Sequence, residues 1–212
     1  IAVAWMNQIS RRALQGDEVR DARMGWLIII GSLPIVILGY LGQDLIRDNF
    51  RSLWLIAIVL IVFGIILGIA DKYGKTERQL HELTPAHGIL YGLAQSLALV
   101  PGVSRSGATI AMGRFLGYSR EAALRYSFLL ALPAVFGSGL YELKGAIGNT
   151  SAAQPFSLPE TLVATVIAFV IGYAVIAWIL KYITTKSFAP FIAYRIGLGS
   201  LLLIALSTGM IS

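Results

Sequence analysis

Long apolar segments, separated by short charged ones, make up most of this chain. Five of them are each about 20 residues long, the length that an α-helix needs to cross a bilayer; they cover residues 24–43, 52–70, 122–143, 159–180 and 188–209. Pro34 lies inside the first segment, and membrane helices tolerate such a proline. Residues 1–9 have the pattern of a helix end. The pattern predicts an all-α integral membrane protein, a polytopic helical bundle.

Residues 84–117 break this pattern. Two apolar pieces, 84–100 and 107–117, flank a short polar island, and each is too short to span comfortably. Apolar segments that Gly and Pro interrupt are typical of broken helices that line a binding site. The region therefore either crosses the membrane once or enters and returns on the same side as a re-entrant hairpin.

The distribution of Lys and Arg favours the hairpin. With a hairpin, one face of the membrane carries the loops that contain Arg11, Arg12, Arg20, Arg23, Lys72, Lys75, Arg78, Arg120, Lys181 and Lys186. The opposite face then carries only Arg47, Arg51 and Lys144. A single crossing would move Lys181 and Lys186 away from the first group, which fits the positive-inside rule less well.

Composition agrees with a membrane protein. The chain is 57% hydrophobic and 13% charged, with a mean hydropathy of +0.75, which excludes an ordinary soluble domain. The net charge of +6 comes from cations in short loops, so we expect membrane lipids and no nucleic acid as partners. The absence of cysteine excludes disulfides and thiolate chemistry.

The sequence opens inside an apolar run without a methionine, and we expect a further segment to precede Ile1. Residues 1–212 are thus predicted to form a single membrane domain that is truncated at its N-terminus. Leu33-Pro34 and Leu132-Pro133 lie at equivalent depths in two spans, each followed by a glycine. If the match is not chance, the chain contains two related halves in an inverted repeat. The counterpart of the 84–117 hairpin would then lie before Ile1.

The polar island contains Arg105, the residue that most needs an explanation. An arginine near bilayer depth costs roughly 2.5–3.5 kcal/mol on insertion scales, so a functional role is the first hypothesis. Its guanidinium can bind two phosphate oxygens at once. A helix that begins at the island would add free N–H groups and the positive end of its dipole. The alternative is a polar turn that caps a helix, with Arg105 paired to a carboxylate or to carbonyl groups.

The neighbours of Arg105 fit an anion site as well. Gly102 and Gly107 permit close backbone approach to a ligand. Three hydroxyl groups, one of which can act as a nucleophile if a base is close, come from Ser104, Ser106 and Thr109. The glycines have the spacing of a phosphate-binding P-loop, but Ala108 stands where that motif needs lysine and no strand precedes it.

The island resembles a known signature. The run 95–109, which contains Pro101-Gly102-Val103-Ser104-Arg105-Ser106-Gly107, is similar to the second signature of the bacitracin-resistance type undecaprenyl-diphosphate phosphatases. Residues 127–133 and 188–195 resemble the same family, so the likeness covers nearly the whole chain. It implies a multi-pass protein of the bacterial inner membrane. That protein would remove the terminal phosphate from the C55 prenyl diphosphate that carries cell-wall precursors, which links it to bacitracin resistance.

The resemblance also implies roles for single residues. Arg105 would hold the diphosphate and stabilise the charge of the transition state. The hydroxyls of Ser104, Ser106 and Thr109 would bind phosphate oxygens, while Gln95, Gly102 and Gly107 would line the substrate site. The family's first signature, with two glutamates and a histidine, belongs before Ile1. The ligands of a divalent cation, Mg²⁺ or Ca²⁺, are therefore expected upstream, and this chain alone would hold half of the active site.

Two other functions remain open. A transporter or flippase for an anionic lipid would use the same inverted repeat and arginine, and a scaffold would need Arg105 only as a paired residue. Arg195, inside the last span, is expected to reach the interface rather than to pair with lipid phosphate. His81 and His87 lack the spacing of a zinc site and are expected to be solvated or interfacial. Gly64 and Gly68 are expected to pack within the chain, with a homodimer as the alternative.

Overall fold

The structure, a computed structural model, describes residues 1–9, 16–42, 52–148 and 158–211, with the side chains of residues 141–148 and 158 left aside. Within these ranges the regular structure is helical, apart from one isolated β-bridge between Arg78 and Tyr118. Of the charges used above to assign the faces of the membrane, Arg11, Arg12, Arg47, Arg51 and the side chain of Lys144 lie outside the described residues.

Five helices are long and apolar enough to cross a membrane, which confirms the predicted multi-pass protein. They are α2 (Asp17–Leu41), α4 (Leu53–Tyr73), α7 (Arg120–Gly148), α8 (Leu158–Ile183) and α9 (Ala189–Ser207). The pattern of residues 1–9 predicted a helix, and the short helix α1 (Ala2–Ile9) is found there and packs on α2. Helix α2 begins before the predicted residue 24 because Asp17 and Glu18 suit the positive end of a helix dipole.

Two short helices replace a sixth span between α4 and α7. They are α5 (Pro85–Ser96) and α6 (Arg105–Phe115), and they coincide with the two apolar pieces predicted from the sequence. Thr84 caps α5 by accepting a hydrogen bond of 3.2 Å from the His87 N–H. Two short 3₁₀ turns, η1 (Leu80–Glu82) and η2 (Leu97–Leu99), precede and follow α5.

The two ends of this helical hairpin lie side by side. The Arg78 N–H donates to the Gly117 carbonyl over 3.0 Å, and the Ser119 N–H donates to the Arg78 carbonyl over 2.9 Å. The chain therefore leaves α6 at the place where it approached α5, while the loop that joins them, residues 97–104, lies at the far end. An α-helix rises about 1.5 Å per residue, so α6 carries the loop roughly 16 Å from the bridge.

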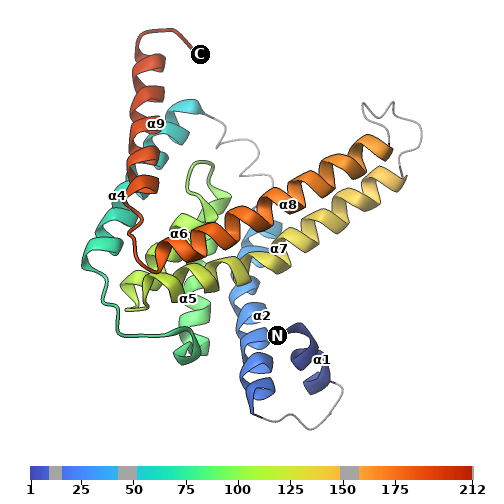
Figure 1. Cartoon of the computed structure of the whole chain (residues 1–212). Coiled ribbons are helices and arrows are strands. Elements are labelled where there is room, and N and C mark those ends of the chain that lie inside the picture. Colours follow the sequence, from blue (N-terminus) through green and yellow to red (C-terminus); the bar gives the residue numbers. More distant parts are fainter. Residues whose placement is uncertain (10–15, 43–51, 149–157, 212) are drawn as a thin grey trace.

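Helix α6 lies at the centre of the fold, in contact with α4, α5 and α7 (Figure 1). Tyr91 of α5 and Tyr126 of α7 are fully buried beside it, with ring centroids 4.8 Å apart. Helices α2 and α5 cross closely, because a Cβ on Gly92 would lie 2.2 Å from the Gly31 carbonyl oxygen. The core thus surrounds the helix that carries the polar island.

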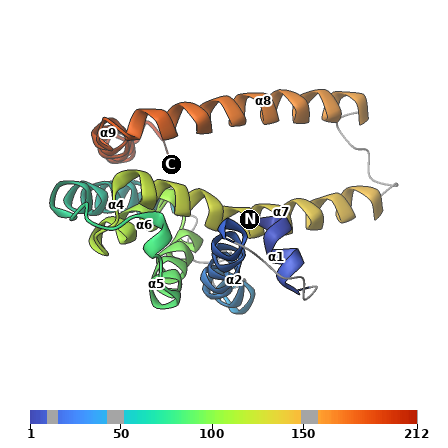
Figure 2. The same cartoon turned by 60° about the horizontal axis from the view of Figure 1, so that its bottom comes forward.

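Apolar side chains that the fold leaves uncovered lie mainly on the outer helices. Helix α8 contacts α7 but is exposed along most of its length, and it stands apart from α2 and α5 in Figure 2. Exposed apolar helix surfaces of this length are expected where a helix faces lipid. Gly64 and Gly68 of α4 both face Ile192 or Ile196 of α9, which confirms their predicted packing within the chain.

Two buried tyrosines provide a matched test of the core. The Tyr126 hydroxyl donates to the Leu27 carbonyl over 2.7 Å, whereas the buried Tyr91 hydroxyl has no partner among the described residues. Tyr126→Phe is expected to lower the free energy of unfolding by about 1 kcal/mol, the usual net value of a hydrogen bond. Tyr91→Phe removes no bond and is expected to leave stability unchanged or raised. Thermal unfolding of the purified protein in detergent measures both, and equal losses would contradict this assignment.

Candidate active site

The loop between α5 and α6, residues 97–104, packs between α4 and α9. Gly102 adopts a positive φ of 94°, which L side chains rarely take, and a Cβ there would lie 2.9 Å from the Ile56 carbonyl oxygen of α4. Glycine is therefore needed both for the turn and for the close approach to α4. The predicted ligand-facing role of Gly102 stays a prediction beside this structural one.

Ser104 begins α6 in a strained conformation. Its φ is 65°, and it is the one residue other than glycine with a positive φ among those described. Its Oγ accepts the Gly107 N–H over 3.3 Å and lies 3.5 Å from the Ser106 Oγ. A Cβ on Gly107 would lie 3.3 Å from this Oγ, so glycine leaves room for the cap. The strain at Ser104 places two hydroxyls at the start of α6.

Arg105 follows directly, at the first position of α6. Its side chain is half-buried, and no hydrogen bond or ion pair joins it to another described residue. The N–H groups in the first turn of a helix have no partner within the helix, and the helix dipole is positive there. The half-buried charge and these donors together make the start of α6 a place that favours an anion.

Arg195 supplies a second guanidinium to the loop. Its side chain is 9% exposed, and its Nη2 donates to the Gly102 carbonyl over 2.7 Å and to the Val103 carbonyl over 3.0 Å. The prediction that Arg195 reaches the interface was wrong, because these carbonyls need a donor inside the fold. The sequence did contain a sign of this role. An arginine within an apolar span is unfavourable without a partner, at Arg195 as at Arg105.

Thr109 and Gln95 are both fully buried. The Thr109 Oγ1 lies 2.7 Å from the Ser127 Oγ of α7 and donates to carbonyls of the first turn of α6, so its hydroxyl ties α6 to α7. The Gln95 amide is 0% exposed and has no partner for its oxygen or its nitrogen among the described residues. An unsatisfied buried amide is unfavourable by about 1–3 kcal/mol. The Gln95 amide therefore has free hydrogen-bonding groups, as does the buried Arg195 Nε, which also lacks a partner among the described residues.

His87 lies at the other end of the hairpin from the loop, as an interfacial histidine was predicted to. Its Nδ1 lies 2.7 Å from the Tyr118 hydroxyl and its Nε2 lies 3.4 Å from the Arg78 guanidinium. Because a guanidinium only donates, Nε2 accepts and Nδ1 carries the proton. Burial, and then the charge of Arg78, lower the pKa of His87. The His87 ring therefore contacts Arg78 and Tyr118, at the end of the hairpin away from the 97–104 loop.

The ligands of the divalent cation were expected before Ile1, and the described residues do not test that prediction. None of them form a group of three His, Asp or Glu side chains able to hold one metal ion. The start of α6 offers hydroxyls, N–H groups and guanidinium charges, which suit an anion, whereas Mg²⁺ and Ca²⁺ require carboxylate or carbonyl oxygens. These residues can bind the phosphate part of a site without holding its metal.

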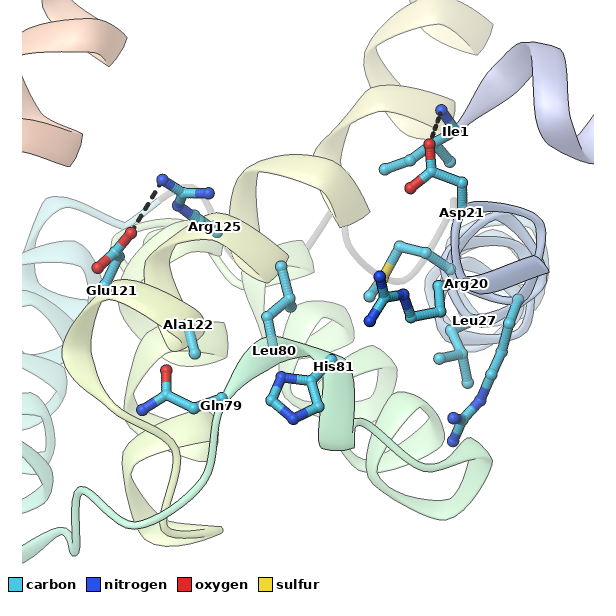
Figure 3. A pocket seen from close by; sticks show the side chains of 12 residues that line it. Ile1, Arg20, Asp21, Leu27, Gln79, Leu80, His81, Glu121, Ala122 and Arg125 are labelled. Carbon is cyan, nitrogen blue, oxygen red and sulfur yellow. Dashed lines mark hydrogen bonds and ion pairs between the residues drawn. The ribbon is translucent and has the colours of Figure 1, made fainter. Parts of the chain in front are cut away.

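A pocket of about 680 Å³ lies elsewhere, between α2, η1 and α7 (Figure 3). Its arginines already have partners, because Arg125 pairs with Glu121 at 2.9 Å and Arg23 donates to the Leu83 carbonyl over 2.8 Å. No residue of the 97–104 loop lines it. Because Arg105 has no partner among the described residues, the loop, and not this pocket, is the candidate active site.

Gly102 allows a test of the loop that needs no substrate. Gly102→Ala is expected to lower stability by about 2 kcal/mol or more, because of the left-handed conformation and the clash with α4. Gly197→Ala in α9, where a Cβ would meet nothing within 4 Å, is the control and should be neutral or slightly stabilising. Thermal unfolding in detergent compares the two. Equal unfolding temperatures for the two variants would show that Gly102 is not tightly packed against α4.

Known proteins are similar to this chain over nearly its whole length. The family model described as Bacitracin resistance protein BacA matches residues 1–201. A protein of Pseudarthrobacter chlorophenolicus named undecaprenyl-diphosphatase is 55% identical over 212 residues, which are 100% of this chain and 76% of that protein. A protein of Renibacterium salmoninarum with the same name is 57% identical over 208 residues, 98% of this chain and 74% of that protein. The chain belongs to the bacitracin resistance protein BacA family.

Proposed function

We propose that this protein hydrolyses undecaprenyl diphosphate to the monophosphate and inorganic phosphate, in the inner membrane of a bacterium. The observation that carries the proposal is the unpaired guanidinium of Arg105 at the start of α6, inside a bundle of apolar helices. A diphosphate headgroup on a prenyl chain matches this combination of an anion site and lipid surroundings. The relatives named undecaprenyl-diphosphatase, at 51–57% identity, support the choice of substrate.

In this proposal α5 and α6 form a re-entrant hairpin. The β-bridge between Arg78 and Tyr118 supports it, because the chain returns to the level from which it entered. The positions of the loop cations support it as well. Arg120 and Lys186 line one small pocket together with the 76–79 segment, so these basic loops meet at one end of the molecule. The 97–104 loop then lies about halfway through the bilayer.

The inverted repeat is supported by contacts between equivalent residues. The repeat aligns Leu33 with Leu132, and the same offset aligns Leu27 with Tyr126 and Gly31 with Leu130. The Tyr126 hydroxyl bonds to the Leu27 carbonyl, and a Cβ on Gly31 would lie 2.8 Å from the Leu130 side chain. Residues that touch their own equivalents are those next to a two-fold axis. A pseudo-two-fold axis between α2 and α7 therefore accounts for both contacts.

The chemistry that we propose for these residues is positioning and charge stabilisation. Arg105 binds two oxygens of the terminal phosphate, and the free N–H groups of α6 and the Ser106 hydroxyl bind others. Ser104, Gly102 and Gly107 shape the turn that presents these donors, and Thr109 fixes α6 on α7. As the bond between the two phosphates breaks, these donors stabilise the charge that builds up on the phosphoryl oxygens. Gln95 completes the substrate site through its unpaired amide.

Arg105 is the residue that tests this proposal. Arg105→Ala is expected to lower kcat for phosphate release by about 100-fold or more, the usual effect of removing a transition-state donor. Stability should not fall, because the Arg105 side chain has no partner among the described residues to lose. Arg125→Ala, an exposed arginine of α7 paired with Glu121, is the matched control and should keep full activity. Activity is measured with the purified protein in liposomes that contain undecaprenyl diphosphate.

The same liposomes separate hydrolysis from transport. Movement of the labelled lipid between leaflets without release of phosphate would favour a flippase, the second function that an inverted repeat and a buried arginine can serve. Normal phosphate release by the Arg105→Ala variant would contradict the role assigned to this residue.

The proposal also includes a divalent cation, Mg²⁺ or Ca²⁺, whose ligands come from outside the described residues. Treatment with EDTA is expected to abolish phosphate release, and either added cation is expected to restore it. The chelator should not lower the unfolding temperature of the described helices, since no described group of residues holds a metal. Full activity after exhaustive chelation would remove the cation from the proposal.

A further inference from the structure

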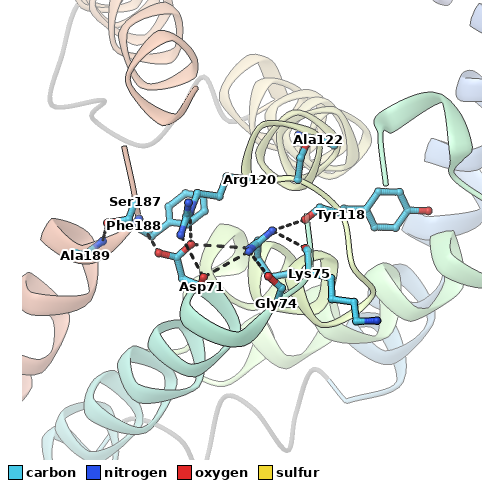
Figure 4. A network of polar contacts seen from close by, with 11 residues as sticks. Asp71, Gly74, Lys75, Tyr118, Arg120, Ala122, Ser187, Phe188 and Ala189 are labelled. Carbon is cyan, nitrogen blue, oxygen red and sulfur yellow. Dashed lines mark hydrogen bonds and ion pairs between the residues drawn. The ribbon is translucent and has the colours of Figure 1, made fainter. Parts of the chain in front are cut away.

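A buried acid, Asp71, joins the elements that carry the two arginines of the loop. It lies near the C-terminal end of α4 and is 6% exposed. Its Oδ1 accepts a hydrogen bond of 2.5 Å from the Arg120 Nε at the start of α7, and its Oδ2 accepts one of 3.2 Å from the Phe188 N–H (Figure 4). Phe188 is the residue directly before α9. One carboxylate thus connects α4, α7 and α9.

The contact with Phe188 sets the position of α9. Phe188 and Arg195 are separated by about two helical turns, so they lie on the same face of α9. Asp71 holds this face at its start, and two turns later the same face donates to the carbonyls of Gly102 and Val103. Tight packing of Gly199 of α9, whose Cβ would lie 2.8 Å from the Ala57 carbonyl oxygen, limits sideways movement of the helix.

Arg114 makes a similar connection for α6. It is 1% exposed, and its guanidinium donates to the carbonyls of Gly74 over 2.6 Å, Tyr118 over 2.6 Å and Lys75 over 2.9 Å. Its Nε lies 3.9 Å from the Asp71 Oδ1. The end of the helix that begins at Arg105 is therefore held beside the same acid (Figure 4).

We propose that Asp71 is a positioning residue for the active-site loop, which acts by fixing the start of α9 and so the reach of Arg195 to the carbonyls of Gly102 and Val103. This inference rests on the proposed function for its catalytic consequence. Without the bond from Phe188, α9 can shift along α4, Arg195 loses its carbonyl partners, and the turn before Ser104 is no longer held.

Phosphate release gives the first readout. Asp71→Asn keeps the shape of the side chain but replaces one acceptor by a donor that faces an N–H or a guanidinium. It is expected to lower kcat/KM by roughly 10-fold to 100-fold, the range that a displacement of about 1 Å can produce. Glu77→Gln, an exposed acid that pairs with Lys75, is the matched control and should leave activity unchanged.

A double-mutant cycle shows whether Asp71 acts through Arg195. The activity of the Asp71→Asn, Arg195→Ala double variant is expected to equal that of Arg195→Ala alone, because residues that act as a unit are not additive. Losses that simply multiply would overturn the proposal, since Asp71 would then act by another route.

A thiol readout is independent of activity. The chain has no cysteine, so Val103→Cys, at a buried loop position, can be labelled with a membrane-permeant thiol reagent. Asp71→Asn and Arg195→Ala are each expected to speed this labelling several-fold. Ala94→Cys, an equally buried position on α5, is expected to stay slow in both backgrounds.

The possible results distinguish a failure of the role proposed for Asp71 from a failure of the proposed function. Faster labelling at both cysteines would mean general loosening, and unchanged labelling at Val103→Cys would mean that Asp71 does not hold the loop; either result overturns the inference. If the complete protein, with any segment that precedes Ile1, releases no phosphate, the proposed function fails, while the labelling rates still decide the role of Asp71.

Discussion

A stretch of polar backbone can lie among apolar helices only if each of its N–H and C=O groups finds a partner. Three kinds of bond satisfy part of the 97–104 loop. The Leu97 and Val100 carbonyls accept from the N–H groups of Val100 and Val103 in two successive turns, the Ser104 side chain caps α6, and Arg195 donates to the carbonyls of Gly102 and Val103. Once these bonds are made, the loop is held between the helices, and the start of α6 is left open to a ligand.

The two arginines at this loop have different fates. Arg195 stabilises the fold, because its guanidinium is buried and bonded to carbonyls, whereas Arg105 is half-buried and has no partner among the described residues. The bonded charge of Arg195 stabilises the loop, whereas the charge of Arg105 is unfavourable until an anion binds. The membership of the chain in the BacA family and the names of its relatives agree with a phosphate as that anion.

The sequence predicted the helices better than it predicted their contacts. Period and length identified all five spans, and the two short apolar pieces became α5 and α6. The predicted span ended at residue 70, but α4 continues to Tyr73 because Arg120 and the Phe188 N–H bond to Asp71 inside the fold. No local pattern reveals such a partner from the far end of the chain. The prediction for Arg195 was wrong for the same reason. Its partners are backbone carbonyls, and because every residue has one, the sequence does not indicate which of them need a donor.

The contact between Tyr126 and Leu27 has a consequence for how the two halves of this chain could have arisen. If they descend from one duplicated ancestor, side chains beside the axis originally met copies of themselves. Two tyrosines could not both occupy the space where the Tyr126 ring now reaches the Leu27 carbonyl. Two leucines at positions 31 and 130 would clash, since even a Cβ on Gly31 would lie 2.8 Å from the Leu130 side chain. Divergence would therefore have begun at these central positions, so the oldest differences between the halves are to be sought in the middle of the bundle, away from the catalytic chemistry.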